Sequence, residues 1–154
     1  MKFKSNKLVI KQLDKKLQNF EVVQYVEVPK EGWICLTRKT LNMSLRQLGD
    51  RLGVTPQGMK KIEANEKGGG ISLNALRQAG EALNLKLVYG FIYKSQTLEQ
   101  MVEERAVEMA RKIVMRTSTS MKLEDQENTS QRLREAIQEL TDELKREMPK
   151  SLWD

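Results

Sequence analysis

Residues 43–66 read Met-Ser-Leu-Arg-Gln-Leu-Gly-Asp-Arg-Leu-Gly-Val-Thr-Pro-Gln-Gly-Met-Lys-Lys-Ile-Glu-Ala-Asn-Glu, and this stretch decides the fold. Ser44 precedes a short run with helical apolar spacing, and its hydroxyl can satisfy a free amide of a first helical turn. Gly53 follows the run directly and can adopt the left-handed conformation that ends a helix. The pattern predicts a short helix over residues 45–52.

A second helix is expected directly after this turn. Thr55 is another good N-cap, and Pro56 falls at the first helical position, where its missing N–H costs nothing. Met59 and Ile62 are spaced to face inward from a helix over residues 56–66. Two short helices joined through a glycine turn are typical of a helix-turn-helix.

The outer face of this second helix suits a polyanion. Its exposed positions carry Gln57, Gly58, Lys60 and Lys61, none of which is acidic or apolar. Glutamine can pair with N6 and N7 of adenine, and lysine can reach guanine or a phosphate. The pattern indicates a helix that can enter the major groove of DNA.

Similar signals predict a helix on each side of the motif. Gly32 opens a helix that begins at Trp33, and Ser72 caps another after a glycine loop. Residues 85–93 are β-prone and are predicted as one strand, which needs a partner because an isolated strand is marginal. That partner is either residues 22–28, which are also β-prone, or the same strand of a second subunit.

The remaining stretches predict helices at both ends of the chain. Helical spacing of apolar residues occurs over 7–20, 97–116 and 130–148. The polar run 117–120 is expected to interrupt the helical structure between the last two of these segments. The apolar stripe of the last helix has coiled-coil spacing over less than two heptads. It either packs within the chain or forms a dimer contact.

Basic charge is concentrated in the first two of three predicted pieces. Residues 1–31, an N-terminal helix and basic arm, carry a net charge of +3. Residues 32–93, the helix-turn-helix domain with its trailing strand, carry +5, and residues 94–154, a helical extension, carry −2. This excess favours a polyanionic partner for the first two pieces, with a solvated basic surface as the alternative.

Composition excludes several classes of enzyme. The 154 residues include no histidine, so a Ser–His or Cys–His nucleophile pair and a histidine metal site are impossible. Cys35 is the one cysteine, and it is expected to be an inert buried thiol. Glu63 is interpreted as a hydrogen-bond partner of a helix N-terminus rather than a catalytic base. We therefore predict no enzyme activity, no catalytic residue, no metal site and no cofactor.

A lone thiol without a recognisable secretion signal fits the reducing cytosol, so a cytoplasmic protein is expected. The apolar runs are far shorter than the roughly 20 residues of a membrane-spanning helix.

Residues 43–85 resemble the lambda-repressor/Cro-like helix-turn-helix superfamily. The resemblance is carried by the Leu-Gly-Val-Thr turn at 52–55, the Ile62-Glu63 pair and the closing Glu-Ala-Leu-Asn-Leu at 81–85. It implies a mainly α fold with a lambda-repressor-like domain, to which the chain adds a short β element and a helical C-terminal extension. Leu45 departs from the family, which often has a DNA-contacting glutamine there.

The whole chain also resembles a narrower group, the mobile mystery protein A family. The matching features are Gly32-Trp33, Leu87-Val88-Tyr89, the run Met-Lys-Leu-Glu-Asp-Gln at 121–126, and the terminal Leu152-Trp153-Asp154. Members of this group resemble regulators encoded on mobile elements beside a Fic-domain protein. The resemblance implies a transcriptional regulator paired with a Fic toxin-like partner.

The leading hypothesis is a sequence-specific regulator that binds double-stranded DNA as a homodimer and represses its own operon. Two copies of the helix 56–66 would enter the major groove about 34 Å apart. Gln57, Lys60 and Lys61 would meet base edges, and phosphate contacts would come from neighbouring residues. The full set of candidate DNA-binding residues is Ser44, Arg46, Gln47, Thr55, Gln57, Gly58, Lys60, Lys61 and Lys67.

The alternative hypothesis is an antitoxin-like protein that binds and restrains a Fic-domain partner through residues 94–154. Residues 121–126 join two predicted helices and either carry a contact motif or cap the last helix. Trp153 either tucks into the domain or is an exposed anchor. The candidate partner or dimer contacts are Leu87, Tyr89, Leu133, Ile137, Leu140, Leu144 and Trp153.

Overall fold

The structure is a computed structural model that describes residues 2–123 and 130–154. The chain divides into two compact units. The central unit is Val22–Gly90, and the terminal unit combines Met1–Glu21 with Phe91–Asp154. This division differs from the three predicted pieces, because the N-terminal helix belongs with the C-terminal helices.

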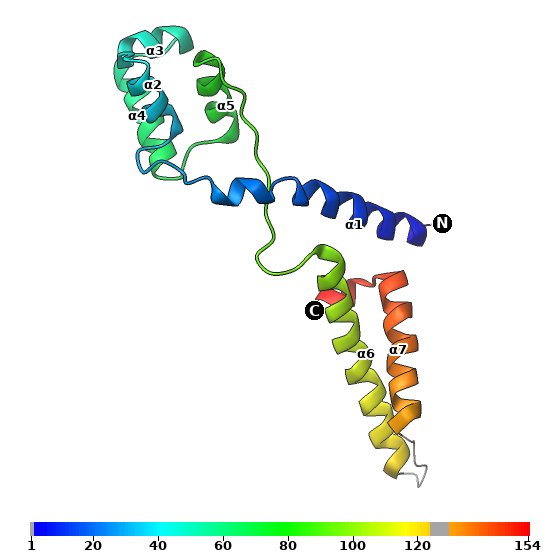
Figure 1. The fold of residues 1–154 in the computed structure, drawn as a ribbon. Coiled ribbons are helices and arrows are strands. Elements are labelled where there is room, and N and C mark those ends of the chain that lie inside the picture. Colours follow the sequence, from blue (N-terminus) through cyan, green and yellow to red (C-terminus); the bar gives the residue numbers. More distant parts are fainter. Residues whose placement is uncertain (1, 124–129) are drawn as a thin grey trace. The chain divides into compact units, whose positions relative to one another are not determined.

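The central unit is a cluster of four helices, as Figure 1 shows. They are α2 (Trp33–Thr40), α3 (Leu45–Leu52), α4 (Pro56–Lys67) and α5 (Leu73–Ala82). All four were predicted, and α3 and α4 begin at the residues expected. Each helix contributes to one core, which consists of Ile34, Leu48, Met59, Ala79 and Leu83.

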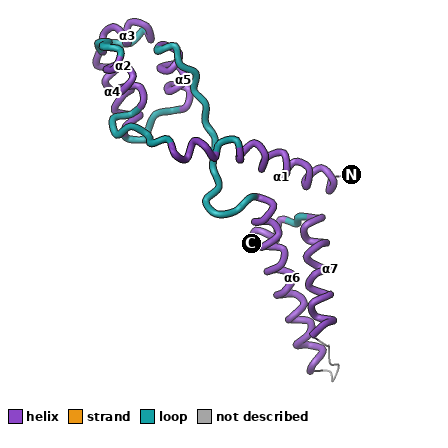
Figure 2. The backbone as a smooth tube through the Cα atoms, in the orientation of Figure 1, coloured by secondary structure: helices purple, strands orange, loops and turns teal. Residues whose placement is uncertain are grey.

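The predicted strand over residues 85–93 does not form within the chain. This segment has no regular secondary structure, and none of the described residues forms a β-strand (Figure 2). A strand requires backbone hydrogen bonds to a neighbour. The candidate neighbour, 22–28, instead begins within a short 3₁₀ helix, η1 (Glu21–Tyr25), so the expected pairing within the chain does not form.

The terminal unit contains a long helical hairpin of α6 (Leu98–Leu123) and α7 (Ser130–Glu147). The 3₁₀ helix η2 (Lys150–Trp153) packs on α6, and α1 (Lys2–Gln18) contacts both hairpin helices. The side chains of the described core are small on α6 and larger on the C-terminal elements; they are Val102, Ala106, Ala110, Leu144 and Leu152.

The expected break at residues 117–120 does not occur, because α6 continues through it. The hydroxyls of Thr117, Thr119 and Ser120 donate to the carbonyls four residues earlier, over 3.1, 2.9 and 3.3 Å. Such bonds keep polar side chains within the helix instead of competing with it. Of the run 121–126, the first three residues extend α6, and residues 124–126 lie outside the described residues.

Asp14 of α1 connects the N-terminal helix of the terminal unit to the start of α6. Its carboxylate accepts the backbone N–H of Leu98 at 2.9 Å and of Glu99 at 3.2 Å, at the start of α6. The Tyr93 hydroxyl donates to the same carboxylate at 2.5 Å. Burial raises the pKa of Asp14, but these three hydrogen bonds outweigh it and hold the pKa below its ordinary value. Asp14 is therefore a buried cap that one helix supplies to another.

Candidate nucleic-acid interface

The start of α3 is fixed by a reciprocal capping box. The Ser44 hydroxyl accepts the N–H of Gln47 at 3.1 Å, and Gln47 Oε1 accepts the N–H of Ser44 at 2.8 Å. These two predicted DNA-contacting side chains are thus held by each other at the N-terminus of the helix. The capping bonds leave the amide nitrogen of Gln47 as the donor that it can offer to a phosphate.

The turn between α3 and α4 is compact. Gly53 has a φ of 68°, the left-handed conformation that was expected to end α3. Val54 packs against the core at the angle between the two helices. Gly49 was not singled out from the sequence, yet a Cβ there would lie 2.7 Å from the carbonyl oxygen of Val54. A glycine inside a predicted helix was the available signal, since alanine is the better helix former.

The first turn of α4 is held by its predicted cap. The Thr55 hydroxyl accepts the N–H of Gly58 at 3.0 Å, and Pro56 occupies the first helical position. A Cβ on Gly58 would lie 3.3 Å from the Thr55 hydroxyl oxygen, so this glycine keeps the cap uncrowded. The cap hydroxyl is consequently engaged by the helix that it starts.

The outward stripe of α4 is polar and cationic. Gln57, Lys60, Lys61 and Lys67 are exposed. Met59 is fully buried and belongs to the core of the central unit. With about 3.6 residues per turn, the exposed positions share one side of the helix. Four of the predicted DNA-binding side chains therefore lie together on one accessible surface, which we call the α4 stripe.

One carboxylate of α4 is neutralised inside the central unit. Glu63 is buried and pairs with Arg38 of α2, whose Nε lies 2.5 Å from Glu63 Oε1. Arg38 also donates to the carbonyl of Met43 at 2.8 Å. The hydrogen bond to Glu63 raises the pKa of Arg38 against the opposing effect of burial. The expectation that Glu63 serves a helix N-terminus is therefore wrong, because its carboxylate is used by this arginine.

The other carboxylate, that of Glu66, has the role that was predicted for Glu63. It accepts the backbone N–H of Trp33 at 2.7 Å and of Ile34 at 2.9 Å, at the start of α2. Gly32 makes this approach possible, because a Cβ at Gly32 would lie 2.8 Å from Glu66 Oε2. Both carboxylates of α4 are thus engaged by α2, so no acidic side chain interrupts the α4 stripe.

The last predicted phosphate contact, Arg46, lies in the first turns of α3. Its side chain is 80% exposed and forms only a long, 3.9 Å ion pair with Asp50. An exposed pair of this length contributes little to stability. Its guanidinium can therefore exchange this partner for a phosphate at small cost.

The predicted partner contacts lie in different environments. Leu144 is buried in the terminal unit, and Ile137 and Leu140 pack against the same core. These three side chains pack within the α6–α7 hairpin, which was one of the two alternatives that the sequence left open. Leu133 lines a small hollow on that hairpin together with Ile113.

The other predicted contacts are more accessible. Leu87 is half-buried, whereas Tyr89 is 61% exposed. Trp153 is 49% exposed and does not tuck into the terminal unit. Its neighbour Leu152 fills that place with 1% exposure. Arg105 holds the end of the chain by donating to the carbonyls of Leu152 and Asp154.

The remaining chemistry of the described residues is sparse. Cys35 is buried, and burial, followed by the neighbouring Glu63, raises the pKa of its thiol. No group of acidic or cysteine side chains among residues 2–123 and 130–154 could hold a metal ion. Across the same residues, no helix has the length and apolar character needed to cross a bilayer.

Comparison of the chain with family models, with curated proteins and with solved structures gave no match.

Proposed function

We propose that the protein is a sequence-specific DNA-binding regulator whose α4 enters the major groove as the second helix of a helix-turn-helix. Gln57, Lys60 and Lys61 contact base edges in this proposal, while Arg46, Gln47 and Lys67 contact phosphates. Ser44, Thr55 and Gly58 shape the two helix N-termini that approach the DNA backbone. The protein acts in the cytoplasm as a repressor of its own operon.

The single observation that carries the proposal is the composition of the α4 stripe. A helix that faces a polyanion needs cations outward and no uncompensated carboxylate beside them. On α4, Glu63 is paired with Arg38 and Glu66 caps α2, so the outward side carries glutamine and lysines. Ordinary solvated helices more often mix both signs on the exposed face.

The test is binding to the DNA upstream of the protein's own gene, compared with a scrambled duplex of the same composition. Fluorescence anisotropy over a salt series, from about 50 to 200 mM, reports the affinity and the salt slope for both duplexes. We expect selective binding to the upstream DNA and a steep loss of affinity as salt rises. Equal affinity for the two duplexes would contradict a sequence-specific regulator.

Two variants separate base reading from charge. Gln57→Ala should weaken binding by about 1–3 kcal/mol and relax specificity at one base pair. Lys60→Ala/Lys61→Ala should weaken binding and lower the salt slope by less than about two, because both lysines contact base edges and not phosphates in this proposal. Arg111→Ala/Arg116→Ala removes two exposed cations from α6 and is the matched control. A control effect as large as that of the lysine pair would argue against the α4 stripe.

We propose further that the regulator binds as a homodimer through the segment that contains Leu87 and Tyr89. Exposed apolar side chains over Val88, Tyr89 and Phe91, which are 69, 61 and 78% exposed, support this assignment. Their β-prone backbone is unpaired within the chain and can pair with a second copy. Analytical ultracentrifugation should show a dimer that Val88→Pro dissociates, because proline removes a ladder donor. An unchanged dimer would exclude this segment.

A second candidate is partner binding by the terminal unit, and the exposure of Trp153 favours it. Arg105 and the buried Leu152 fix the backbone beside this tryptophan, so its ring is presented on an ordered surface. An aromatic side chain held in this way is typical of an interface anchor. The partner in this candidate is a Fic-domain protein that the chain restrains as an antitoxin does.

Co-purification with a Fic-domain protein, the partner that this candidate proposes, tests it. Trp153→Ala should abolish co-purification. Trp33→Ala is the matched control, because Trp33 is 44% exposed but lies in the central unit. Equal losses for the two variants would reject a specific role for Trp153.

A further inference from the structure

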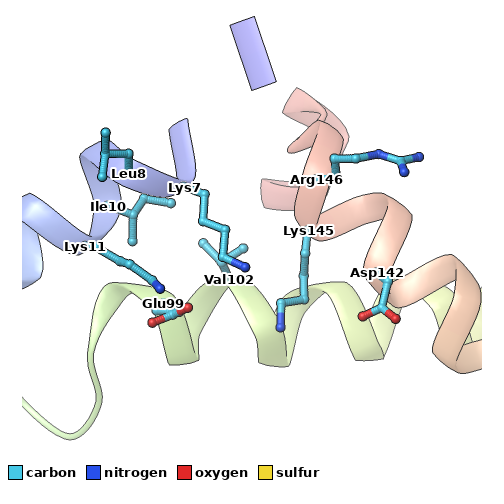
Figure 3. A pocket seen from close by; sticks show the side chains of 9 residues that line it. All are labelled: Lys7, Leu8, Ile10, Lys11, Glu99, Val102, Asp142, Lys145 and Arg146. Carbon is cyan, nitrogen blue, oxygen red and sulfur yellow. The ribbon is translucent and has the colours of Figure 1, made fainter. Parts of the chain in front are cut away.

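The terminal unit contains an open cavity of about 610 Å³ between α1, α6 and α7. Small-molecule sites in proteins usually have volumes of about 300–1,000 Å³ and pair an apolar lining with a few polar groups. Figure 3 shows its lining side chains, which α1, α6 and α7 each contribute. The cavity belongs to one compact unit and does not include any residue of the α4 stripe.

The floor of the cavity is apolar. Val102 of α6 is 6% exposed and belongs to the core of the terminal unit, and Ile10 of α1 packs against that core. Leu8, also on α1, is 58% exposed and extends the apolar surface towards solvent. A ligand with a hydrocarbon portion would bury this surface and remove it from water.

The rim of the cavity is mainly cationic. Lys7, Lys11, Lys145 and Arg146 line it, against two carboxylates, Glu99 and Asp142. In Figure 3, Lys7 and Lys11 extend from α1 towards α6, as does Lys145 from α7. The local excess of positive charge favours an anionic head group over a cationic or neutral one.

The cations of the rim differ in whether they already form ion pairs. Lys145 is paired with Glu103 of α6 at 3.1 Å. Of the carboxylates, Asp142 accepts a hydrogen bond from Gln138 at 3.2 Å. Within the described part of the chain, Lys7 and Lys11 form no ion pair. These two ammonium groups beside an apolar floor are therefore the groups best placed to receive an anion.

From this arrangement we propose that the α1–α6–α7 cavity binds a small amphipathic carboxylate, with the hydrocarbon portion on Ile10 and Val102. The carboxylate is held by Lys7 and Lys11. The ligand is a single dissolved molecule of the fatty-acid class, because the volume of the cavity, about 610 Å³, is that of a site for one small molecule. This site is independent of the proposed DNA contacts, so either assignment can fail without the other.

The test is a calorimetric titration of the full-length protein with dodecanoate, at concentrations well below those at which it forms micelles. Dodecyltrimethylammonium has the same tail and the opposite charge, and it serves as the control ligand. We expect one dodecanoate per chain, bound at least tenfold more tightly than the cationic control. Equal affinity for the two ligands, or several dodecanoates per chain without saturation, would overturn the proposal.

Paired variants of α1 locate the site. Lys7→Gln/Lys11→Gln should weaken dodecanoate binding by about tenfold, which lies within the range for the loss of two exposed ion pairs. Lys15→Gln/Lys16→Gln makes the same change in charge on the same helix, at exposed positions that do not line the cavity, and should leave binding within about twofold. Equal effects of the two pairs would contradict the assignment.

A variant of the apolar surface of the cavity and an experiment with lipid vesicles complete the test. Leu8→Gln should weaken dodecanoate binding without unfolding the chain, because Leu8 is mostly exposed, and circular dichroism verifies the fold. Sedimentation with phosphatidylglycerol vesicles distinguishes a membrane surface from a dissolved ligand. Binding to these vesicles without binding to dodecanoate would overturn the proposal in favour of a membrane-surface helix.

Discussion

The central and terminal units fix their helix ends over very different distances along the chain. In the central unit, Ser44, Thr55 and Ser72 each cap an N–H three residues later. In the terminal unit, the first amides of α6 are held by Asp14, which lies 84 residues before Leu98. Local caps can be recognised in a short stretch of sequence, whereas a cap supplied by another helix becomes visible only in the folded unit.

The two units also differ in how they use charge. The central unit buries an ion pair between Arg38 and Glu63 in a small helical cluster. In the terminal unit, each ion pair that involves α6 has at least one side chain that is about half exposed or more. In the pair of Lys145 with Glu103, the exposed side chain is that of Glu103. Buried pairs are costly to disrupt, while exposed pairs contribute little. The comparison leads to quantitative expectations for each unit.

The largest expected effect comes from the two cores. Leu48→Ala should lower the free energy of unfolding of the central unit by about 2–5 kcal/mol, because Leu48 is fully buried and leaves a cavity. Leu152→Ala should act similarly on the terminal unit. Residue-resolved hydrogen exchange measures both. If each variant reduced protection in both units equally, the two units would unfold as one and the comparison would fail.

The buried ion pair gives the next effect. Glu63→Gln should destabilise the central unit by about 3 kcal/mol, because it leaves the Arg38 guanidinium buried without its counter-charge. Glu31→Gln disrupts the exposed Lys39–Glu31 pair, whose side chains are 56 and 39% exposed, and should lower the free energy of unfolding far less. Urea denaturation monitored by circular dichroism compares the two variants. Similar losses would show that burial does not distinguish these pairs.

The interhelical cap gives a similar but smaller effect. Asp14→Asn should destabilise the terminal unit by about 2 kcal/mol, because one carboxylate oxygen becomes an amide that cannot accept the N–H of Glu99. Asp142→Asn, at an exposed position, is the control and should change stability by at most about 0.5 kcal/mol. Protection of the α6 amides by hydrogen exchange measures the difference. Unchanged protection at Leu98 and Glu99 would argue against the cap.

The same cap has a defined pH dependence. The folded-state pKa of Asp14 is held below its ordinary value of 3.8, so the folded state binds fewer protons than the unfolded state. Its contribution is fully present above the ordinary pKa and is lost as the pH falls through the folded-state value. The stability difference between the wild-type protein and Asp14→Asn should therefore narrow below about pH 4. A constant difference down to pH 2 would contradict the assignment.

The helices of the central unit could be predicted closely because their signals are local. Ser44 and Gly53 predicted the bounds of α3, and Thr55 and Pro56 predicted the start of α4. The role of Glu63 was assigned wrongly and Glu66 was given none, because side chains three residues apart on a helix meet different groups of the neighbouring helix. Only the position of α2 determines which carboxylate meets Arg38 and which meets the α2 amides.

The terminal unit and the segment 85–93 were harder to predict. The run 117–120 contains helix-breaking residue types, yet its hydroxyls find partners within the helix itself. β-propensity over 85–93 could not produce a strand without a partner backbone. The apolar stripe of α7 did not reveal its own partner either, because spacing alone does not distinguish a neighbouring helix from a second subunit.

The last expected effects, comparable to or smaller than that of the Asp14 cap, concern the two glycines around the α3–α4 turn, one predicted from the sequence and one not. An alanine inside a helix normally stabilises it by up to about 1 kcal/mol relative to glycine. At Gly49 the sign should reverse, because the new Cβ would lie 2.7 Å from the Val54 carbonyl oxygen and backbone must shift. Gly49→Ala should therefore destabilise the central unit by about 1–3 kcal/mol.

Gly53→Ala should destabilise the central unit by about 1 kcal/mol for a different reason. Its Cβ would meet no atom within 4 Å, so the cost comes only from the φ of 68° that alanine disfavours. Gly53→Asn is the matched control, because asparagine tolerates this conformation and should recover part of the loss. No asparagine-specific recovery is expected at Gly49, where the contact is steric. If asparagine recovered stability relative to alanine at both Gly49 and Gly53, the backbone conformation and not the steric contact would explain the loss at Gly49.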